Sequence, residues 1–309
     1  MNWSPKTHLK VKTPARVIVE LLDAPLVGDK DAHFDCFRTL DAGGPGSLVF
    51  CTPRFDVDVV QQVSHSTASI ILCDETLKGR VGPKDGQAII FVKNPKAAFS
   101  HVIREVVDFP VMSSHDPVSV GAGANIEDGV TFGPNVVIGS HVHIGAGSVI
   151  HANVVLYDDV QIGRRTVIHA GCVIGHPGVG PIGSADEGWE QFPDLGDVRI
   201  GDDVQIGANT CIARAPLTST NIEDGVKVAN MVNIGHNAHL RRNSVVTSMC
   251  MMARGELGEG VWLAPGVVLR PGVNIGANSM IGAGAVVVKD IPPNVIAFGN
   301  PAKVWKERS

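Results

Sequence analysis

One histidine, His236, has sequence neighbours that suit a catalytic role. It ends the run Asn-Met-Val-Asn-Ile-Gly-His of residues 230–236, so it follows the aliphatic Ile234 by two positions. An imidazole titrates near neutral pH and can take a proton from an amine or hydroxyl that attacks a thioester. Acyl transfer needs such a base, together with a donor for the tetrahedral oxyanion. We therefore expect His236 to be a general base, with an ordinary surface histidine as the alternative.

The sequence around His236 repeats with a period of six residues. That period suits neither an amphipathic helix nor an alternating strand; it suits a short strand and a corner, where Gly supplies dihedrals that a Cβ resists. Three hexads form one triangular coil of about 18 residues, and stacked coils pair their strands at roughly 4.8 Å. The sequence therefore predicts a parallel β-helix with one inward aliphatic residue per hexad. The longest unbroken series is Val120, Ile126, Phe132, Ile138, Ile144, Ile150, Leu156, Ile162, Ile168 and Ile174, and the period resumes at 200–212, 222–246 and, after a one-residue slip near Met251, 257–287.

The β-helix also predicts where the oxyanion donor should lie. Position 254 follows His236 by one coil, so it should stack beside the histidine. The expected donor is the backbone N–H of Arg254 or, because of the slip, that of Gly255.

The parts of the chain outside the repeat predict a second domain and two insertions. Residues 1–112 lack the period and predict a small α/β domain, with strands at 16–21, 47–50, 68–73 and 88–92, a helix at 97–107, and a junction at 113–117. The β-helix domain is expected at 113–290 and a C-terminal cap at 291–309. Insertions near 177–198 and 213–221 should form a binding face. Trp189, inside the first, is a candidate substrate contact, as is His176 beside it.

Composition narrows the class of protein. With 26 basic and 31 acidic residues the net charge is −5, which does not indicate a nucleic-acid partner. The apolar runs are too short for a transmembrane segment, and no signal peptide is expected at the N-terminus. Six cysteines lie far apart without a CxxC pair, which is typical of reduced thiols, so a cytoplasmic location is expected.

These motifs resemble a known family. The hexad phrase is similar to that of the hexapeptide-repeat superfamily, whose members are left-handed β-helices and mostly homotrimers with active sites between prisms. Within it, the stretch 175–239 looks like the UDP-3-O-acylglucosamine N-acyltransferases of lipid A synthesis. The matching segments are Gly178-Val179-Gly180, Trp189, Phe192 to Gly196, Ile200 to Thr210 and Asn230 to Asn237, with Asp41 to Phe50 and Asn94 to Phe99 in the N-terminal domain.

The resemblance implies roles for individual residues. His236 matches the family's catalytic base. The N-terminal domain would hold the uracil of a UDP-linked sugar on aromatic side chains at Phe50 and Phe55, with Thr52 between them where the family has Asn. Near the base, Asn233 and Asn237 are expected to contact substrate.

Several positions depart from the family pattern. Ala229 replaces an aspartate that could orient the histidine, so Asn233 or Asn230 is expected to orient it instead, or the base is weaker. Gly272-Val273 replaces a second histidine, and Ala253-Arg254-Gly255 replaces Ala-Gly-Ser. The C-terminus lacks the family's longer basic helix. Its Gly299 to Lys303 segment is similar to sugar acetyltransferases that use acyl-CoA, and Lys289 and Lys303 are the expected contacts with the acyl carrier.

The sequence thus predicts an N-acyltransferase that moves an acyl group to the amine of a UDP-linked amino sugar, in lipid A or surface-glycan synthesis. The co-substrate would be acyl-CoA or acyl carrier protein, with no bound cofactor and no metal. Acyl length, the sugar, and N- versus O-transfer stay open. Two alternatives also stay open: a non-catalytic β-helix that binds or assembles, and a gamma-class carbonic anhydrase. The second is disfavoured because no two histidines are five positions apart.

Overall fold

Two units make up the chain, Met1–Pro110 and Val111–Ser309. The computed structural model describes residues 12–52, 58–106, 118–186, 188–191 and 194–308. The expected junction at 113–117 therefore lies outside the described residues. No helix in these ranges is long and apolar enough to cross a bilayer.

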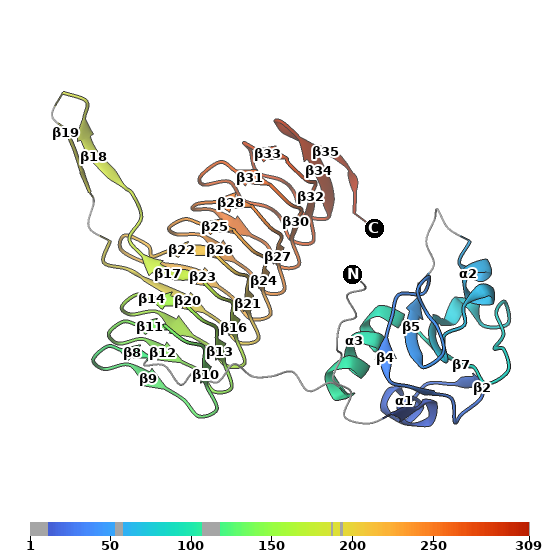
Figure 1. Cartoon of the computed structure of the whole chain (residues 1–309). Helices are drawn as coiled ribbons and strands as arrows, with labels where there is room; N and C mark the ends of the chain where they lie inside the picture. The colour runs from blue at the N-terminus through green and yellow to red at the C-terminus, as the bar shows by residue number, and fades with distance from the viewer. Residues whose placement is uncertain (1–11, 53–57, 107–117, 187, 192–193, 309) are drawn as a thin grey trace, which may run out of the picture. The chain divides into compact units, whose positions relative to one another are not determined.

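The second unit is a prism of three parallel sheets, and successive strands of the chain join each sheet in turn (Figure 1). The first face stacks β8 (Ser119–Val120), β11 (Val137–Ile138), β14 (Val155–Leu156), β17 (Val173–His176), β22 (Cys211–Ala213), β25 (Asn233–Ile234), β28 (Met251–Met252), β31 (Val268–Leu269) and β33 (Val286–Val287). The second face stacks β9 (Asn125–Ile126), β12 (His143–Ile144), β15 (Gln161–Ile162), β20 (Asp197–Ile200), β23 (Ser219–Ile222), β26 (His239–Leu240) and β29 (Glu256–Leu257). The third face stacks β10 (Thr131–Phe132), β13 (Val149–Ile150), β16 (Val167–Ile168), β21 (Gln205–Ile206), β24 (Lys227–Val228), β27 (Val245–Val246), β30 (Trp262–Leu263), β32 (Met280–Ile281), β34 (Val295–Gly299) and β35 (Ala302–Glu307).

The repeat positions form the core of this prism, as the sequence predicts. From Ile138 onward the inward residue of each described hexad is buried, and these residues make one continuous cluster. The register follows the coil length where no insertion intervenes: Asn233 lies opposite Met251, one coil later. It also lies opposite Cys211, from which the second insertion separates it. The predicted slip is confirmed, because His239 lies opposite Glu256, one residue short of a full coil. The predicted parallel β-helix is therefore confirmed.

Both interruptions of the repeat leave the prism at the same corner, after strands of the first face. The first insertion carries the hairpin β18 (Pro181–Ser184) and β19 (Gly188–Gln191), which projects from the prism (Figure 1). Its returning end is joined to the second insertion by backbone hydrogen bonds from Leu195 N to Pro216 O, 2.7 Å, and from Asp197 N to Thr218 O, 3.1 Å. The two insertions therefore form one connected structure.

The C-terminal strands β34 and β35 form an antiparallel hairpin on the third face. Phe298 and Trp305 are exposed and meet edge to face at 5.6 Å, and Lys306 lies over the Trp305 ring. Lys303 lies opposite Phe298 in this hairpin.

The first unit is a sheet in the order β2-β7-β6-β5-β4 with helices on both sides. Its strands are β2 (Leu26–Gly28), β4 (Cys36–Phe37), β5 (Ser47–Cys51), β6 (Ile70–Asp74) and β7 (Ala88–Val92), beside the small pair β1 (Thr13–Pro14) and β3 (His33–Phe34). Residues of α1 (Ala15–Leu22) and α3 (Pro95–Val106) pack in one core cluster with the sheet, and residues of α2 (Val59–His65) in another. A short 3₁₀ helix, η1 (Glu75–Leu77), follows β6.

One predicted strand in this unit is wrong. Residues 16–21 were expected as a strand because they are rich in β-branched side chains, but they form helix α1. The buried positions are Ala15 and Ile18, three apart, while Val17 is exposed. Burial at helical spacing against the sheet therefore outweighs the local β-propensity.

The continuous core predicts a large effect from removing one inward side chain. Ile206→Ala on the third face should lower the free energy of unfolding by about 2–5 kcal/mol, because Ile206 is fully buried. Urea denaturation would measure this loss. The exposed Glu259→Ala should change it by less than about 0.5 kcal/mol. Equal effects of the two substitutions would contradict the proposed packing.

Candidate functional site

His236 lies at a cavity that both insertions help to form. It follows β25 at the corner between the first and second faces and is half-buried. The cavity has a volume of about 310 Å³. Its walls come from the first insertion, the second insertion and the next coil: Gly178, Gly180, Pro181, Ile182, Asp194, Pro216, His236 and Arg254.

The first insertion is held in place by polar contacts around Gly178. The backbone N–H of Gly178 donates to Asp194 Oδ2 at 2.7 Å, and Gln191 Nε2 donates to the Gly178 carbonyl at 2.5 Å. A Cβ at Gly178 would lie 3.9 Å from Cδ2 of His236. The insertion therefore runs directly past the imidazole. The sequence analysis did not name Asp194 as a site residue, although Asp194 lies in the segment Phe192 to Gly196 that resembles the family.

The imidazole of His236 is hydrogen-bonded to the next residue in the sequence, Asn237. Nδ1 lies 2.8 Å from Asn237 Oδ1. The same Asn237 donates from Nδ2 to Thr218 Oγ1 at 2.7 Å, and from its backbone N–H to Thr220 Oγ1 at 3.0 Å.

Neither residue expected to orient His236 contacts its ring. Asn233 points outward from β25 and is exposed, and the Oδ1 of Asn230 accepts from the backbone N–H of Ala208 at 2.8 Å. That expectation is wrong because alternation along the strand directs Asn233 away from the corner. Asn230 belongs to the preceding corner of the coil.

Of the two expected oxyanion donors, one has its N–H occupied. Arg254 donates its backbone N–H to the carbonyl of His236 at 2.9 Å. The N–H of Gly255 has no acceptor among the described residues. Gly255 has φ +71°, and a Cβ there would lie 2.1 Å from the carbonyl oxygen of Val273, so the position requires glycine. Gly255 therefore remains as the candidate donor.

Two predicted substrate contacts, His176 and Trp189, lie outside the cavity wall, as does His239, for which the sequence predicted no role. His176 ends β17, where the first insertion begins, and its Nδ1 is 2.9 Å from the carbonyl oxygen of Pro177. Trp189 lies on β19 of the projecting hairpin and is 65% exposed. His239 lies on the second face, where its Nε2 is 2.8 Å from Glu223 Oε1.

Beyond His236, a row of basic residues follows the same corner. Arg254, Arg270 and Lys289 come one or two positions after the last first-face residue in each of three successive coils, and all three are exposed. Within the described part of the chain none of these three side chains has a carboxylate partner, whereas Arg241 and Arg242 on the second face pair with Glu256 and Asp224. We call these three residues the basic column. The predicted carrier contact Lys289 belongs to it; Lys303 lies on β35 of the third face.

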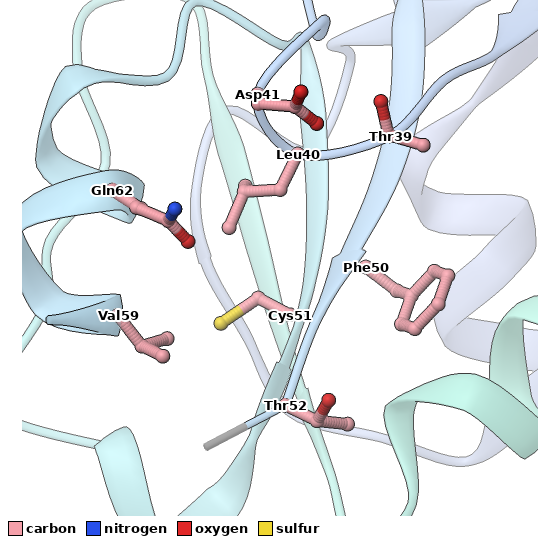
Figure 2. A pocket seen from close by; sticks show the side chains of 8 residues that line it. All are labelled: Thr39, Leu40, Asp41, Phe50, Cys51, Thr52, Val59 and Gln62. Carbon is pink, nitrogen blue, oxygen red and sulfur yellow. The ribbon is translucent and has the colours of Figure 1, made fainter. Parts of the chain in front are cut away.

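The first unit has its own cavity, of about 420 Å³, beside the end of β5 (Figure 2). Phe50 and Thr52 are among its lining residues, which also include Thr39, Leu40, Asp41, Cys51, Val59 and Gln62. Figure 2 shows the Phe50 ring turned away from Leu40, Cys51 and Val59, and it packs on Phe99 with centroids 4.9 Å apart. A hydrogen bond from Thr39 lowers the pKa of Asp41, which favours its carboxylate form. Phe55 lies outside the described residues.

Among the described residues no group of three His, Cys, Asp or Glu side chains is arranged to hold a metal ion.

Comparison with known proteins identifies the repeat and the family. The Bacterial transferase hexapeptide (six repeats) family matches residues 117–152, 147–176 and 255–289, and the Hexapeptide repeat of succinyl-transferase family matches 197–230. The UDP-N-acetylglucosamine O-acyltransferase of Moraxella catarrhalis RH4 aligns at TM-score 0.55 and 25% identity, over 62% of this chain and 74% of that one. The enzyme of Acinetobacter baumannii aligns at TM-score 0.55 and 23% identity, over 62% and 72%. This similarity supports the predicted left-handed β-helix.

Proteins similar in sequence identify the family more specifically than the solved structures do. The UDP-3-O-acylglucosamine N-acyltransferase of Delftia acidovorans is 40% identical over 74% of this chain and 68% of its own length. That of Cupriavidus taiwanensis is 38% identical over 72% and 68%, and that of Pseudomonas syringae pv. tomato is 33% identical over 72% and 67%. The chain therefore belongs to the UDP-3-O-acylglucosamine N-acyltransferase family and is an acyltransferase built on hexapeptide repeats.

Proposed function

We propose that this acyltransferase moves an acyl group from a thioester carrier to the amine of a UDP-linked amino sugar in lipid A synthesis. The observation that carries this proposal is the cavity in which His236 lies between both insertions and the next coil. The curated relatives are named for a UDP-linked acylglucosamine acceptor, which supports the same substrate class here.

The reaction uses His236, which lines that cavity, and the backbone N–H of Gly255, which follows Arg254 of the cavity wall. His236 takes a proton from the acceptor amine as its nitrogen attacks the thioester carbon. The new C–N bond forms, and the carbonyl oxygen becomes an oxyanion that accepts a hydrogen bond from the free N–H of Gly255. When the C–S bond breaks, the proton returns from His236 to the departing thiolate. These steps use only side chains and backbone of the protein.

The donor would reach His236 along the basic column. Acyl-CoA and acyl carrier protein both present the thioester on a phosphopantetheine arm, whose phosphate is anionic. Arg254, Arg270 and Lys289 offer cationic groups that no carboxylate in the described chain neutralises, in three successive coils beginning beside His236. Lys303, on the C-terminal hairpin, would contact the carrier beyond the arm.

The acceptor's uridine would bind in the cavity of the first unit. Thr52, Asp41 and Gln62 line it and supply polar groups for the ribose and the base edge. Phe50, whose ring packs on Phe99, would be the aromatic contact. Asn233, His176 and Trp189 would contact the acceptor or its acyl chain outside the cavity.

A homotrimer would complete the site. Outward positions on the first face are largely apolar, including Val137, Met251 and Val268, which are 43%, 52% and 37% exposed. The equivalent positions on the second face are polar, such as Gln161 and Arg199. An apolar face of this kind suits contact with a second copy, and a closed ring of identical contacts satisfies it in every copy.

Sedimentation equilibrium should then give three times the chain mass; a monomer at micromolar concentration would contradict this assembly.

Removing the base should reduce turnover without weakening substrate binding. His236→Ala should lower kcat by about 10²–10⁴-fold, the usual contribution of a general base, with little change in KM. Release of the free thiol from acyl-CoA or acyl carrier protein would measure it. His239→Ala is the matched control, because that histidine pairs with Glu223 outside the cavity and should leave kcat within twofold. Unchanged turnover in His236→Ala would refute the assignment of the base.

Removing the two charges of the basic column that lie farther along the corner from His236 should weaken donor binding. The double substitution Arg270→Ala/Lys289→Ala should raise KM for the acyl donor about tenfold or more, because the loss of even one charge-assisted hydrogen bond costs about 1.5–3 kcal/mol. The KM for the sugar should change little, and wild-type KM for the donor should rise with salt. Arg242→Ala, whose partner is Asp224, is the control. A donor KM equal to that of the control would show that the column does not bind phosphate.

A further inference from the structure

The residue after His236, Asn237, is held by three hydrogen bonds. Asn237 stands at a coil corner with φ 59°, a conformation that asparagine tolerates better than most residues. Its Oδ1 contacts Nδ1 of His236, its Nδ2 contacts Thr218, and its backbone N–H contacts Thr220. Several other corners of the prism also have asparagine at positive φ, but only here, among the described residues, does that side chain bond a histidine at the cavity.

The chemistry of the amide specifies the state of the ring. An amide oxygen only accepts hydrogen bonds, so Oδ1 facing Nδ1 requires that Nδ1 carry the proton. The neutral imidazole then has its lone pair on Nε2, the nitrogen next to the Cδ2 atom near Gly178. Once the ring takes a second proton, the bond to Oδ1 is kept. Asn237 therefore selects the tautomer that can act as a base and holds it in one orientation.

The amide is itself held by the insertions. Thr220 is fully buried on β23, and Thr218 lies at the end of the second insertion. The carbonyl of Thr218 accepts from Asp197 of the first insertion, and a Cβ at Gly196 would lie 2.1 Å from that carbonyl oxygen. The order of contact is thus first insertion, second insertion, Asn237 and His236.

Among the described residues, no other side chain hydrogen-bonds the imidazole of His236. Ala229 has no polar side chain, and Asn230 is bonded to Ala208. The charged side chains that line the cavity with His236 are Asp194 and Arg254. Asp194 bonds the Gly178 N–H, and neither residue has a hydrogen bond to the imidazole in the described chain.

We propose that Asn237, anchored by Thr218 and Thr220, is the positioning residue that fixes His236 as its Nδ1–H tautomer for proton abstraction at Nε2. This proposal rests on the proposed function of His236. It also assigns a purpose to the second insertion, which supplies Thr218. Because the amide is neutral, it orients the base without the added attraction for a proton that a carboxylate would exert.

The test compares three substitutions in the full-length protein. Asn237→Gly removes the acceptor but tolerates the positive φ, so backbone strain does not obscure the result. Asn237→Asp keeps an acceptor oxygen at the same place. Asn243→Gly is the control, because it removes another corner asparagine, at φ 56°, away from the cavity. Circular dichroism and thermal unfolding verify that each variant is folded.

Two readouts separate positioning from a merely structural role. Nitrogen-15 NMR of labelled histidines, with the His236 signals assigned by their loss in His236→Gln, reports which ring nitrogen carries the proton. Wild type, Asn237→Asp and Asn243→Gly should show Nδ1–H, whereas Asn237→Gly should lose this preference. Turnover should follow: kcat should fall about 10- to 100-fold in Asn237→Gly with KM unchanged, and return to within a few-fold of wild type in Asn237→Asp.

The pH dependence of kcat is a third readout. A carboxylate at position 237 stabilises the imidazolium, so the unprotonated base forms only at higher pH, and the acid limb of the kcat profile should move upward in Asn237→Asp. Asp194 and Arg254 are unchanged in every variant, so they do not account for a difference.

Failure of the positioning role and failure of the proposed function would give different results. An active wild type with Nε2–H on His236, or an Asn237→Gly variant with wild-type tautomer and kcat, would overturn the positioning role and leave the proposed function standing. A wild type that shows Nδ1–H but transfers no acyl group to any UDP-linked amino sugar would overturn the proposed function, and with it the catalytic purpose of the contact.

Discussion

The hydrogen-bonded stacking of coils in register is the constraint on which the rest of this structure depends. Each short strand satisfies its backbone groups only through the coils before and after it, while one aliphatic side chain per hexad fills the interior. Residues one coil apart are therefore neighbours whatever their chemistry. That is why His236, Arg254, Arg270 and Lys289, which are far apart in the sequence, follow one another along a single corner.

The candidate site lies where this register is interrupted. Both insertions leave the stack at the corner that carries His236, and they are bonded to each other through Leu195, Asp197 and Thr218. The coil after His236 is one residue short. At a regular corner the carbonyl accepts a hydrogen bond from the N–H nineteen positions later, as the carbonyl of Asn230 does from Met249. The carbonyl of His236 accepts instead from Arg254, one position earlier than in a regular coil. The N–H of Gly255 has no acceptor in the described chain. The short coil thus brings Arg254, and not Gly255, to the carbonyl of His236.

Much of this could be predicted from the sequence, because periodicity reports burial directly. The six-residue repeat specified the inward residues, the slip and the corner position of His236. Local contacts were harder to predict. Asn237 was expected to contact substrate and was not recognised as the partner of the imidazole, since pairing of adjacent side chains depends on the positive φ of that corner. Residues 16–21 were predicted as a strand because local propensity does not include the sheet on which α1 packs. Asp194 gave no periodic signal, as insertions follow no repeat.

The central claim is that this prism transfers an acyl group to an amine on a UDP-linked sugar. The most direct measurement is the mass of the products formed when purified protein is given a UDP-linked amino sugar with acetyl-CoA, 3-hydroxybutyryl-CoA or a long-chain acyl carrier protein. The account predicts that the sugar gains the mass of one acyl group minus one hydrogen, with fragmentation that locates the group on nitrogen. The donor that serves best will give the acyl length. A folded protein that leaves every sugar unmodified with every donor would contradict the account and would favour a β-helix that only binds.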